Sequence, residues 1–263
     1  MLLKGRILII SGIGPGLGVK LAIEAAREGA AALAIGARTS TRLDDAEREI
    51  AAVNADCQVL KQPTDIRDAA QCRRLAEASR ERFGRIDALV NSAFFWGTNA
   101  AAASAELEGW KAVYDTNLIG TMQMTQAVVP IMQADGGGAI VNISTMATIK
   151  PHAGEAGYAA SKGALNVVTK YLATELGPSN IRVNLIRMGW MYGAPVQGYI
   201  RHAARTQGVP EQQVYDSIAA SVPLRRLVTD DECARAALFL ASDYASAVTG
   251  AVLDANGGEA MTA

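Results

Sequence analysis

Tyr158 and Lys162 are the two residues whose types and spacing most directly suggest chemistry. They lie in the run GYAASK at 157–162, just before a helix-forming segment at 163–177. Positions four apart share one face of a helix, so a phenol and an ammonium lie side by side. A nearby cation favours the phenolate, which makes Tyr158 a candidate acid or base near neutral pH. The alternative is an ordinary half-exposed pair, and the rest of the chain has to decide between the two.

The first strand is expected at residues 6–11, and a glycine-rich loop at 12–18 follows it. The helix that comes next has an inner face that begins at Leu17, and it ends near Gly29. Strand, glycine loop and helix together suit a pyrophosphate, because glycines admit the ligand and the helix N-terminus offers free N–H groups. The alternative is a set of tight turns. The predicted nucleotide contacts are Ser11, Gly12, Gly14, Gly16, Leu17 and Gly18.

The second expected strand, 31–36, ends where the adenosine ribose normally lies. No carboxylate follows it before Asp44, whereas Arg38 stands two residues beyond it. An acidic residue at this place binds the ribose hydroxyls of NAD, and an arginine accommodates the 2′-phosphate of NADP. We therefore expect NADP(H), with NAD(H) possible, and we place Arg38 and Thr39, assisted by Ser40, on the phosphate. A solvated loop charge is the alternative for Arg38.

Polar residues follow the next two expected strands. After strand 57–61 come Asp65 and Ile66, where Asp65 can accept from the adenine amino group; nearby acidic residues such as Asp68 commonly cap helices instead. After strand 86–90 come Asn91, Ser92 and Ala93, also predicted nucleotide contacts. An aromatic run then begins, and it either walls a pocket or packs in a loop; it consists of Phe94, Phe95 and Trp96.

Asn117 and two adjacent hydroxyls complete the candidate set. A long helical stretch is expected at 106–132, and an amide in its apolar middle is disfavoured unless paired, so Asn117 is a candidate for binding water or kinking the helix. Strand 139–144 runs into Ser144 and Thr145, whose hydroxyls are placed to hold a substrate oxygen.

Composition limits the class of protein. The chain has 263 residues, 50% of them apolar, which favours one large α/β domain spanning 1–263. A net charge of −1 with scattered basic residues argues against nucleic acid and membrane surfaces and for a small-molecule ligand. Three separated cysteines predict reduced core thiols of a cytoplasmic protein, with no metal site. No apolar run is long enough for a membrane span or a signal peptide.

These motifs, in this order and over almost the whole chain, resemble the short-chain dehydrogenase/reductase family. The resemblance rests on Gly12/Gly16/Gly18, Asp65, Asn91, Asn117, Ser144-Thr145, Tyr158-x-x-x-Lys162, and the VTG and NGG runs at 248–250 and 256–258. It implies a Rossmann-like doubly wound domain with a seven-stranded parallel sheet, helices on both faces, and NAD(P)(H) at the carboxyl ends of the strands. The family's members are mostly dimers or tetramers, so a homo-oligomer is expected. The apolar residues 165, 168, 172 and 176 either form an interface or belong to the core.

The resemblance also implies a role for each catalytic residue. Tyr158 is the general acid/base, Lys162 holds the nicotinamide ribose and lowers the tyrosine pKa, and Asn117 anchors a water of the proton relay. The family's catalytic serine lies thirteen residues before the tyrosine, which selects Thr145 and not Ser144.

The chain departs from the family pattern near the nicotinamide. Phe94 stands where the family has glycine, Met188-Gly189 replaces Pro-Gly, and Gly193 stands at a frequent threonine. Gly189 and Met191 are predicted nucleotide contacts. The departures put the carboxamide contacts of the Trp190 and Met191 backbone in question, so that either the cofactor is held less rigidly or the loop closes differently.

The segment 190–225 is expected to form a substrate-binding lid, with helical pieces near 199–206 and 211–220. We predict an apolar cavity for a hydrophobic, cyclic or acyl secondary alcohol or ketone; subunit packing is the alternative for its aromatic residues. The predicted substrate contacts are Phe94, Phe95, Trp96, His152, Trp190 and Tyr192.

The sequence thus favours an NAD(P)-dependent oxidoreductase acting on CH–OH groups. Two alternatives stay open: a catalytically silent nucleotide-binding regulator or scaffold, since fold alone does not fix function, and a dehydratase or epimerase that uses the same tyrosine.

Overall fold

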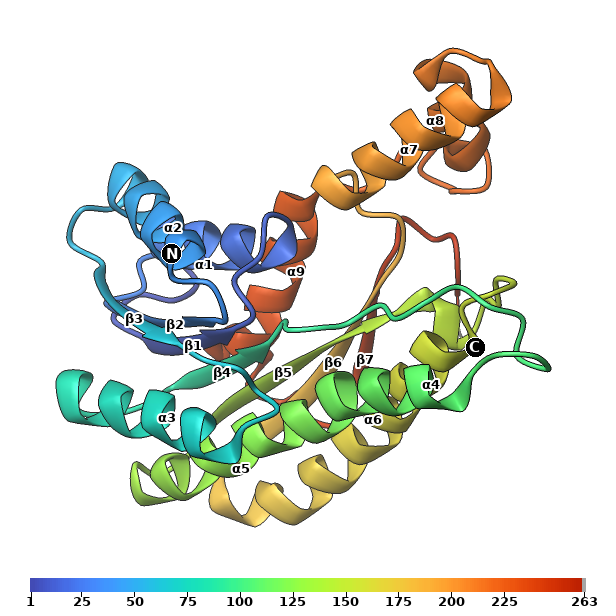
Figure 1. The fold of residues 1–263 in the computed structure, drawn as a ribbon. Helices are drawn as coiled ribbons and strands as arrows, with labels where there is room; N and C mark the ends of the chain where they lie inside the picture. Colours follow the sequence, from blue (N-terminus) through green and yellow to red (C-terminus); the bar gives the residue numbers. More distant parts are fainter. Residues whose placement is uncertain (262–263) are drawn as a thin grey trace.

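One parallel sheet forms the centre of the molecule (Figure 1). The computed structural model describes residues 1–261, and within them seven strands pair in the order β3-β2-β1-β4-β5-β6-β7. The predicted doubly wound sheet is confirmed, and most strand limits agree with the sequence within two residues. The strands are β1 (Ile7–Ser11), β2 (Ala32–Ala37), β3 (Gln58–Pro63), β4 (Ala88–Asn91), β5 (Gly138–Thr145), β6 (Ile181–Met188) and β7 (Val252–Ala255).

Helices cover both faces of this sheet, because its strands are apolar on both sides. Figure 1 shows α1, α2 and α9 on one face and α3 to α6 on the other. Each face has its own continuous apolar cluster. The helices of the first face are α1 (Leu17–Arg27), α2 (Ser40–Val53) and α9 (Asp230–Ala241). Those of the second are α3 (Ala69–Phe83), α4 (Leu107–Tyr114), α5 (Thr121–Ala134) and α6 (Ala156–Leu176).

The strand order reverses between β1 and β4. Ser11 pairs with Gly36 of β2 on one side and with Asn91 of β4 on the other. The chain therefore leaves β1 and β4 toward opposite faces and opens a crevice at their carboxyl ends, the usual ligand position in such sheets.

The long helix expected at 106–132 is interrupted at Asn117. A π-helical turn, η1 (Asp115–Gly120), joins α4 to α5. Within it the Asn117 amide turns away from the helix to bond the backbone of Phe95 and the hydroxyl of Ser161. The predicted kink is confirmed. Its cause is the wider π-helical turn, which redirects the side chain of Asn117.

Two further helices stand apart from the sheet, at the upper right of Figure 1. They are α7 (Ala194–Gln207), which begins five residues before the expected helical piece, and α8 (Glu211–Ala219). Pro195 in the first turn of α7 supports this earlier start. A small separate core, containing Ile200, Val214 and Leu227, holds the two helices together.

The remaining structural expectations have clear outcomes. Leu165, Leu172 and Leu176 of α6 are buried, so that face packs in the core and is not an interface, while Val168 packs partly buried against the same cluster. The three cysteines are buried and free, as predicted. Among the described residues, no helix combines the length and apolarity that crossing a membrane requires.

Candidate active site

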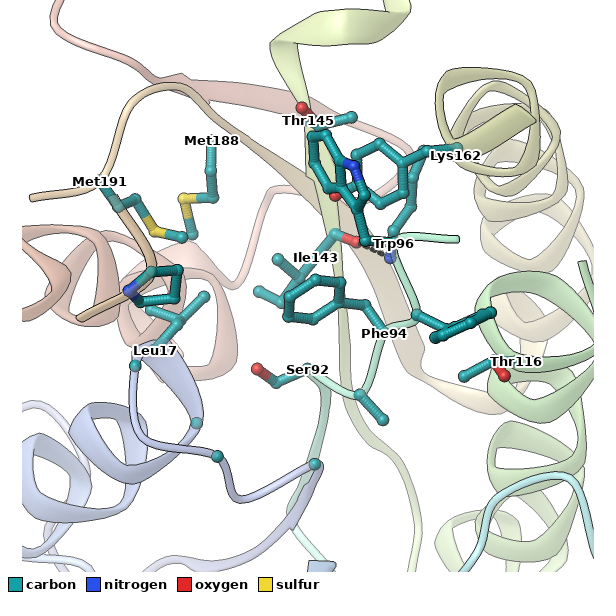
Figure 2. A pocket seen from close by; sticks show the side chains of 18 of the residues that line it. Leu17, Ser92, Phe94, Trp96, Thr116, Ile143, Thr145, Lys162, Met188 and Met191 are labelled. Atoms are coloured by element: carbon teal, nitrogen blue, oxygen red, sulfur yellow. Dashed lines mark hydrogen bonds between the residues drawn. The ribbon is translucent and has the colours of Figure 1, made fainter. Parts of the chain in front are cut away.

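A cavity of about 660 Å³ lies at the carboxyl ends of the central strands (Figure 2). Its wall includes the glycine loop after β1, the segment after β2, the aromatic segment after β4, and the start of α6. Figure 2 shows Leu17, Met188 and Met191 on one side and Phe94, Trp96 and Lys162 on the other. Parallel pairing aligns these strand ends, so the sheet brings together residues far apart in sequence.

The glycine loop has room only for glycine at two positions. Gly12 has a φ of 100°, and a Cβ there would lie 2.2 Å from the Ala93 backbone nitrogen. A Cβ on Gly18 would lie 2.0 Å from the Gly12 carbonyl oxygen, so α1 packs directly on the loop. At Gly14 nothing lies within 4 Å. No side chain caps α1, so its N-terminus offers N–H groups to an anion. The loop therefore fits the pyrophosphate of a dinucleotide.

Arginines surround the opposite end of the cavity. Arg38 and Thr39 line it as predicted, together with Arg42 of α2 and Arg67, which the sequence analysis missed. Arg42 lies in the first turn of α2, four residues after Arg38, which itself precedes the helix. Asp65 and Ile66 also line this end, but Arg67 Nε donates to Asp65 Oδ1 at 3.0 Å and lowers the pKa of that carboxyl. Asp68 caps α3 through the backbone N–H groups of residues 70 and 71.

Tyr158 and Lys162 face the cavity from the first turns of α6. Lys162 Nζ donates to the Ile143 carbonyl oxygen at 2.8 Å, the dashed line in Figure 2, and burial lowers the pKa of Lys162 to about 8. Burial raises the pKa of Tyr158, and the nearby charge of Glu155 raises it further. The surroundings of Tyr158 thus hold its pKa above the usual value, and the expected lowering by Lys162 stays a prediction.

The two adjacent hydroxyls at the end of β5 point to different places. Ser144 Oγ donates to Asn166 Oδ1 at 2.8 Å and is almost wholly buried. The Thr145 hydroxyl is hydrogen-bonded to the Tyr158 phenol, which opposes the rise in its pKa. Alternation along the strand separates the two side chains, and it leaves Thr145 beside the phenol, as the spacing to Tyr158 predicted.

An aromatic group covers the phenol. The ring centroids of Trp96 and Tyr158 lie 4.4 Å apart, and Phe94 meets Tyr158 edge-on at 6.4 Å. Trp96 Nε1 donates to Asn99 Oδ1 at 2.8 Å, which fixes the indole. The other predicted residues that line the cavity are Ser92, Ala93, Phe95, His152, Gly189, Trp190 and Met191.

Four predicted residues do not line the cavity. Asn91 is buried and donates to Thr125 and Asn142, so it links β4 to β5 and α5. The Ser11 hydroxyl is buried without a partner. Tyr192 packs edge-on against Tyr215 of α8. Asn117 uses both amide hydrogens on protein atoms, where the sequence analysis expected a water. Their side chains complete the support of the site.

Two carboxylates in the wall were also missed. Asp230, at the start of α9, lies against Gly193, where a Cβ would come within 1.8 Å of Asp230 Oδ2. This contact explains why no threonine is accommodated at position 193. Burial raises the pKa of Asp230. Glu155 lies one helical turn before Tyr158, and the same spacing rule that paired Tyr158 with Lys162 would have found it.

Known proteins resemble this chain over nearly its full length. A family model described as Enoyl-(Acyl carrier protein) reductase matches residues 12–259. A 3alpha-hydroxysteroid dehydrogenase of Mediterraneibacter gnavus is 33% identical over 257 residues, covering 98% of both chains. A 3-oxoacyl-[acyl-carrier-protein] reductase of Thermotoga maritima is 34% identical over 260 residues, covering 98% of this chain and 99% of its own. The crystal structure of L-sorbose reductase from Gluconobacter frateurii, complexed with NADPH and L-sorbose, has a TM-score of 0.93 at 29% identity, covering 100% and 99%.

Proposed function

We propose that this chain, which belongs to the short-chain dehydrogenase/reductase family, interconverts a secondary alcohol and a ketone with Tyr158 as the acid/base. The family is one of oxidoreductases, and the hydroxysteroid dehydrogenase and 3-oxoacyl reductase that resemble this chain are named for reactions at CH–OH or carbonyl groups. The observation that carries the proposal is the meeting of Thr145, Tyr158 and Lys162 in one cavity that also contains the glycine loop.

The chain's own residues handle the proton. When bound, a nicotinamide nucleotide accepts or supplies the hydride and, oxidised, places a positive charge that favours phenolate. Tyr158 takes the hydroxyl proton during alcohol oxidation and returns it during ketone reduction. The Thr145 hydroxyl donates to the substrate oxygen as negative charge develops on it. Lys162, held by Ile143, presents its remaining N–H groups to the nucleotide ribose.

Asn117 acts in this proposal as a positioning residue. Its Oδ1 accepts from Phe95 N at 2.7 Å, and its Nδ2 donates to Phe95 O at 2.9 Å. These two bonds hold the segment that carries the aromatic cover of the phenol. Its third bond, from Nδ2 to Ser161 Oγ at 3.0 Å, joins this segment to α6.

NADP(H) is the favoured nucleotide. Arg38, Arg42 and Arg67 gather at the end of the cavity where the adenosine ribose is expected. Only Arg67 is drawn into an ion pair there, with Asp65, which leaves the other two guanidiniums for a 2′-phosphate. The absence of a carboxylate from the end of β2 removes the group that would select NAD(H).

The reacting group is proposed to belong to a hydrophobic, cyclic substrate. Phe94, Phe95 and Trp96 form one wall, and Trp190 and Met191 extend the apolar surface toward α7. The α7–α8 segment, with its separate core, is proposed as a lid that closes as one body over this substrate. L-sorbose reductase, which this chain resembles in fold, was crystallised with NADPH, and this supports a nicotinamide nucleotide as the cofactor.

Tyr158→Phe tests the proposal. Purified protein is mixed with NADPH and a panel of cyclic ketones, oxo-steroids, 3-oxoacyl esters and keto-sugars, and the loss of NADPH absorbance is followed. We expect the parent to reduce at least one class and Tyr158→Phe to be slower by at least about 100-fold, because proton transfer is lost. Nucleotide affinity should be retained in the variant. Equal rates in the two proteins would overturn the proposal.

A nucleotide-binding regulator is a second candidate, favoured by one observation. The Trp96 indole stacks on the Tyr158 phenol, so an aromatic ring covers the reacting group. Tight nucleotide binding without turnover of any compound in the panel would select this candidate.

We also propose a homo-oligomer. Val167 and Tyr171 of α6 are 55% and 65% exposed, and such large apolar side chains on one helix face are candidates for subunit contact. Light scattering of the parent and of Val167→Glu/Tyr171→Glu would measure the mass. A parent that is monomeric at working concentrations would refute this.

A further inference from the structure

The cavity has one polar corner, formed by Glu155 and His152 beside the phenol. Both residues line the cavity, and both are half-buried. Glu155 occupies the N-cap position of α6, yet its side chain makes no capping hydrogen bond. Among the described residues it also forms no ion pair within 4 Å. Glu155 therefore lines the cavity without capping α6, and the charge that acts on its carboxyl is that of His152.

His152 has a ring nitrogen without a hydrogen-bond partner at the same corner. Its Nε2 is buried without a partner. Backbone bonds hold the two residues together, since Glu155 N donates to His152 O at 3.3 Å. Gly154 between them has a φ of 90°, and its carbonyl accepts from Ala100 N at 3.1 Å. The corner is thus a structured turn tied to the aromatic segment. A polar group that has no hydrogen-bond partner in an ordered, partly buried turn lowers the stability of the fold. A ligand that forms hydrogen bonds with both groups would remove this cost.

The two groups differ in what they accept and donate. A carboxylate only accepts, whereas a neutral imidazole offers one N–H donor and one acceptor. A hydroxyl matches both at once, because it donates its proton to Glu155 and accepts from the imidazole N–H. A ketone, ester or carboxylate has nothing to donate to Glu155. The corner therefore favours a group that both donates and accepts, of which a hydroxyl is the commonest on small-molecule substrates.

The separation from the reacting centre sets where that hydroxyl lies on the substrate. Glu155 and Tyr158 are three residues apart at the start of α6, a spacing that puts Cβ atoms about 5–6 Å apart on one helix face. The charge of Glu155 acts on the phenol, which agrees with this closeness. A substrate whose reacting oxygen contacts Tyr158 can reach Glu155 with an oxygen one or two carbons away.

We propose that Glu155 and His152 form a subsite for a second hydroxyl of the substrate, carried on the carbon next to the reacting one or one further along. This rests on the proposed function and narrows its substrate class to hydroxy ketones and the corresponding diols. The apolar walls hold the ring or chain, and the polar corner fixes which carbon meets Tyr158. Glu155 and His152 are specificity-determining residues in this arrangement.

Two ketones that differ by one hydroxyl test the subsite. The ratio of kcat/KM for 2-hydroxycyclohexanone to that for cyclohexanone is measured with NADPH in the parent and in Glu155→Ala, Glu155→Gln and His152→Phe. Glu49→Ala is the matched control, because Glu49 is exposed on α2 outside the cavity wall. Dividing each ratio by that of the parent cancels the different reactivities of the two ketones and any effect on the phenol.

We expect Glu155→Ala to lower the ratio by about tenfold or more, the usual size of losing a hydrogen bond to a charged group. Glu155→Gln keeps an acceptor, so the ratio should fall less than in Glu155→Ala. His152→Phe should lower the ratio by a smaller factor than Glu155→Ala, and Glu49→Ala should leave it unchanged. An unchanged ratio in Glu155→Ala, with both ketones still reduced, would overturn the subsite while leaving the proposed function intact.

A binding measurement separates the two proposals completely. In the Tyr158→Phe background saturated with NADP⁺, titration followed by ligand-observed NMR compares the Kd of cyclohexane-1,2-diol with that of cyclohexanol. Tighter binding of the diol that disappears on adding Glu155→Ala supports the subsite, even if the parent turns over neither ketone and the proposed function fails. Equal affinities for the two alcohols in Tyr158→Phe alone would refute the subsite.

Discussion

The indole of Trp96 lies over the phenol of Tyr158, with ring centroids 4.4 Å apart and the two planes tilted by 30°. The stacking removes water from one face of the phenol, and burial is the largest cause of the raised pKa of Tyr158. We therefore expect a residue on the loop after β4 to influence the acidity of a group at the start of α6.

Trp96→Ala should shift the pH dependence of alcohol oxidation to lower pH. The phenolate is the active form in this direction, so the rate rises with pH through the tyrosine pKa. Admitting water lowers that raised pKa, and the rise then begins at lower pH. The measurement is kcat/KM against pH, with saturating NADP⁺.

Trp96→Phe is the matched control because it keeps an aromatic ring over the phenol. Its pH profile should remain close to that of the parent. A profile in Trp96→Ala that coincides with the parent's would mean that the indole does not set the acidity of Tyr158.

Glu155→Gln should move the same profile in the same direction. The Glu155 charge raises the pKa of Tyr158, since a neighbouring anion disfavours phenolate. Removing the charge lowers that pKa, so oxidation gains rate at low pH and ketone reduction begins to lose rate at lower pH. Both directions are measured on the monofunctional pair cyclohexanol and cyclohexanone. A shift to higher pH would contradict the assignment.

Thr145 and Ser144 should respond differently to loss of the hydroxyl. Thr145→Ala should lower kcat by about 100-fold, because the donor to the developing oxyanion is lost, and Thr145→Ser should recover most of it. Ser144→Ala should keep kcat within about threefold but lose roughly 1 kcal/mol of unfolding free energy with its hydrogen bond to Asn166. Steady-state kinetics and urea unfolding measure the two effects. The reverse pattern would make Ser144 the reacting hydroxyl.

Substitutions at Gly14 and Gly18 should distinguish the role of the loop in nucleotide binding from its role in folding. Gly18→Ala should lower the melting temperature without nucleotide, since its Cβ would lie 2.0 Å from the Gly12 carbonyl oxygen. Gly14→Ala meets nothing within 4 Å and should melt like the parent. Added NADPH should raise the melting temperature of the parent more than that of Gly14→Ala, because the methyl group faces the ligand. An equal rise in both proteins would place the nucleotide elsewhere.

Arg38→Ala and Arg42→Ala should each weaken NADPH binding by about tenfold or more while leaving NADH nearly unchanged, because only NADPH carries the 2′-phosphate. Fluorescence titration gives both affinities. Arg48→Ala, an exposed arginine of α2 paired with Asp45, is the control and should change neither. If the variant with both substitutions kept the parent's preference for NADPH over NADH, neither arginine would bind the 2′-phosphate.

Local patterns predicted the elements well. Short β-branched runs bounded by glycine or polar residues located the strands, and three- and four-residue apolar spacing located the helices. They predicted a kink at Asn117 but not the distant contact that causes it. The π-helical turn at Asn117 depends on the backbone of Phe95, twenty-two residues earlier, which no local periodicity contains.

Spacing also identified the reacting groups but not their surroundings. The i,i+4 relation placed Tyr158 and Lys162 together, yet the ammonium bonds the Ile143 carbonyl and the phenol pKa is raised, both consequences of strand and helix packing. The sequence predicted the same nucleotide contact for Asn91 as for its neighbours Ser92 and Ala93. The pairing of β4 with β5 instead places the Asn91 side chain in the core, where it donates to Asn142.

The sequence by itself determined the sheet, the glycine loop and the candidate acid/base, because these depend on residue type and on short fixed separations along the chain. The tertiary structure decided which hydroxyl reaches the phenol, which arginines join Arg38, and which carboxylate remains unused beside Tyr158. Those relations connect residues from different strand ends, whose distances are set by how the layers pack and not by their separation in the chain.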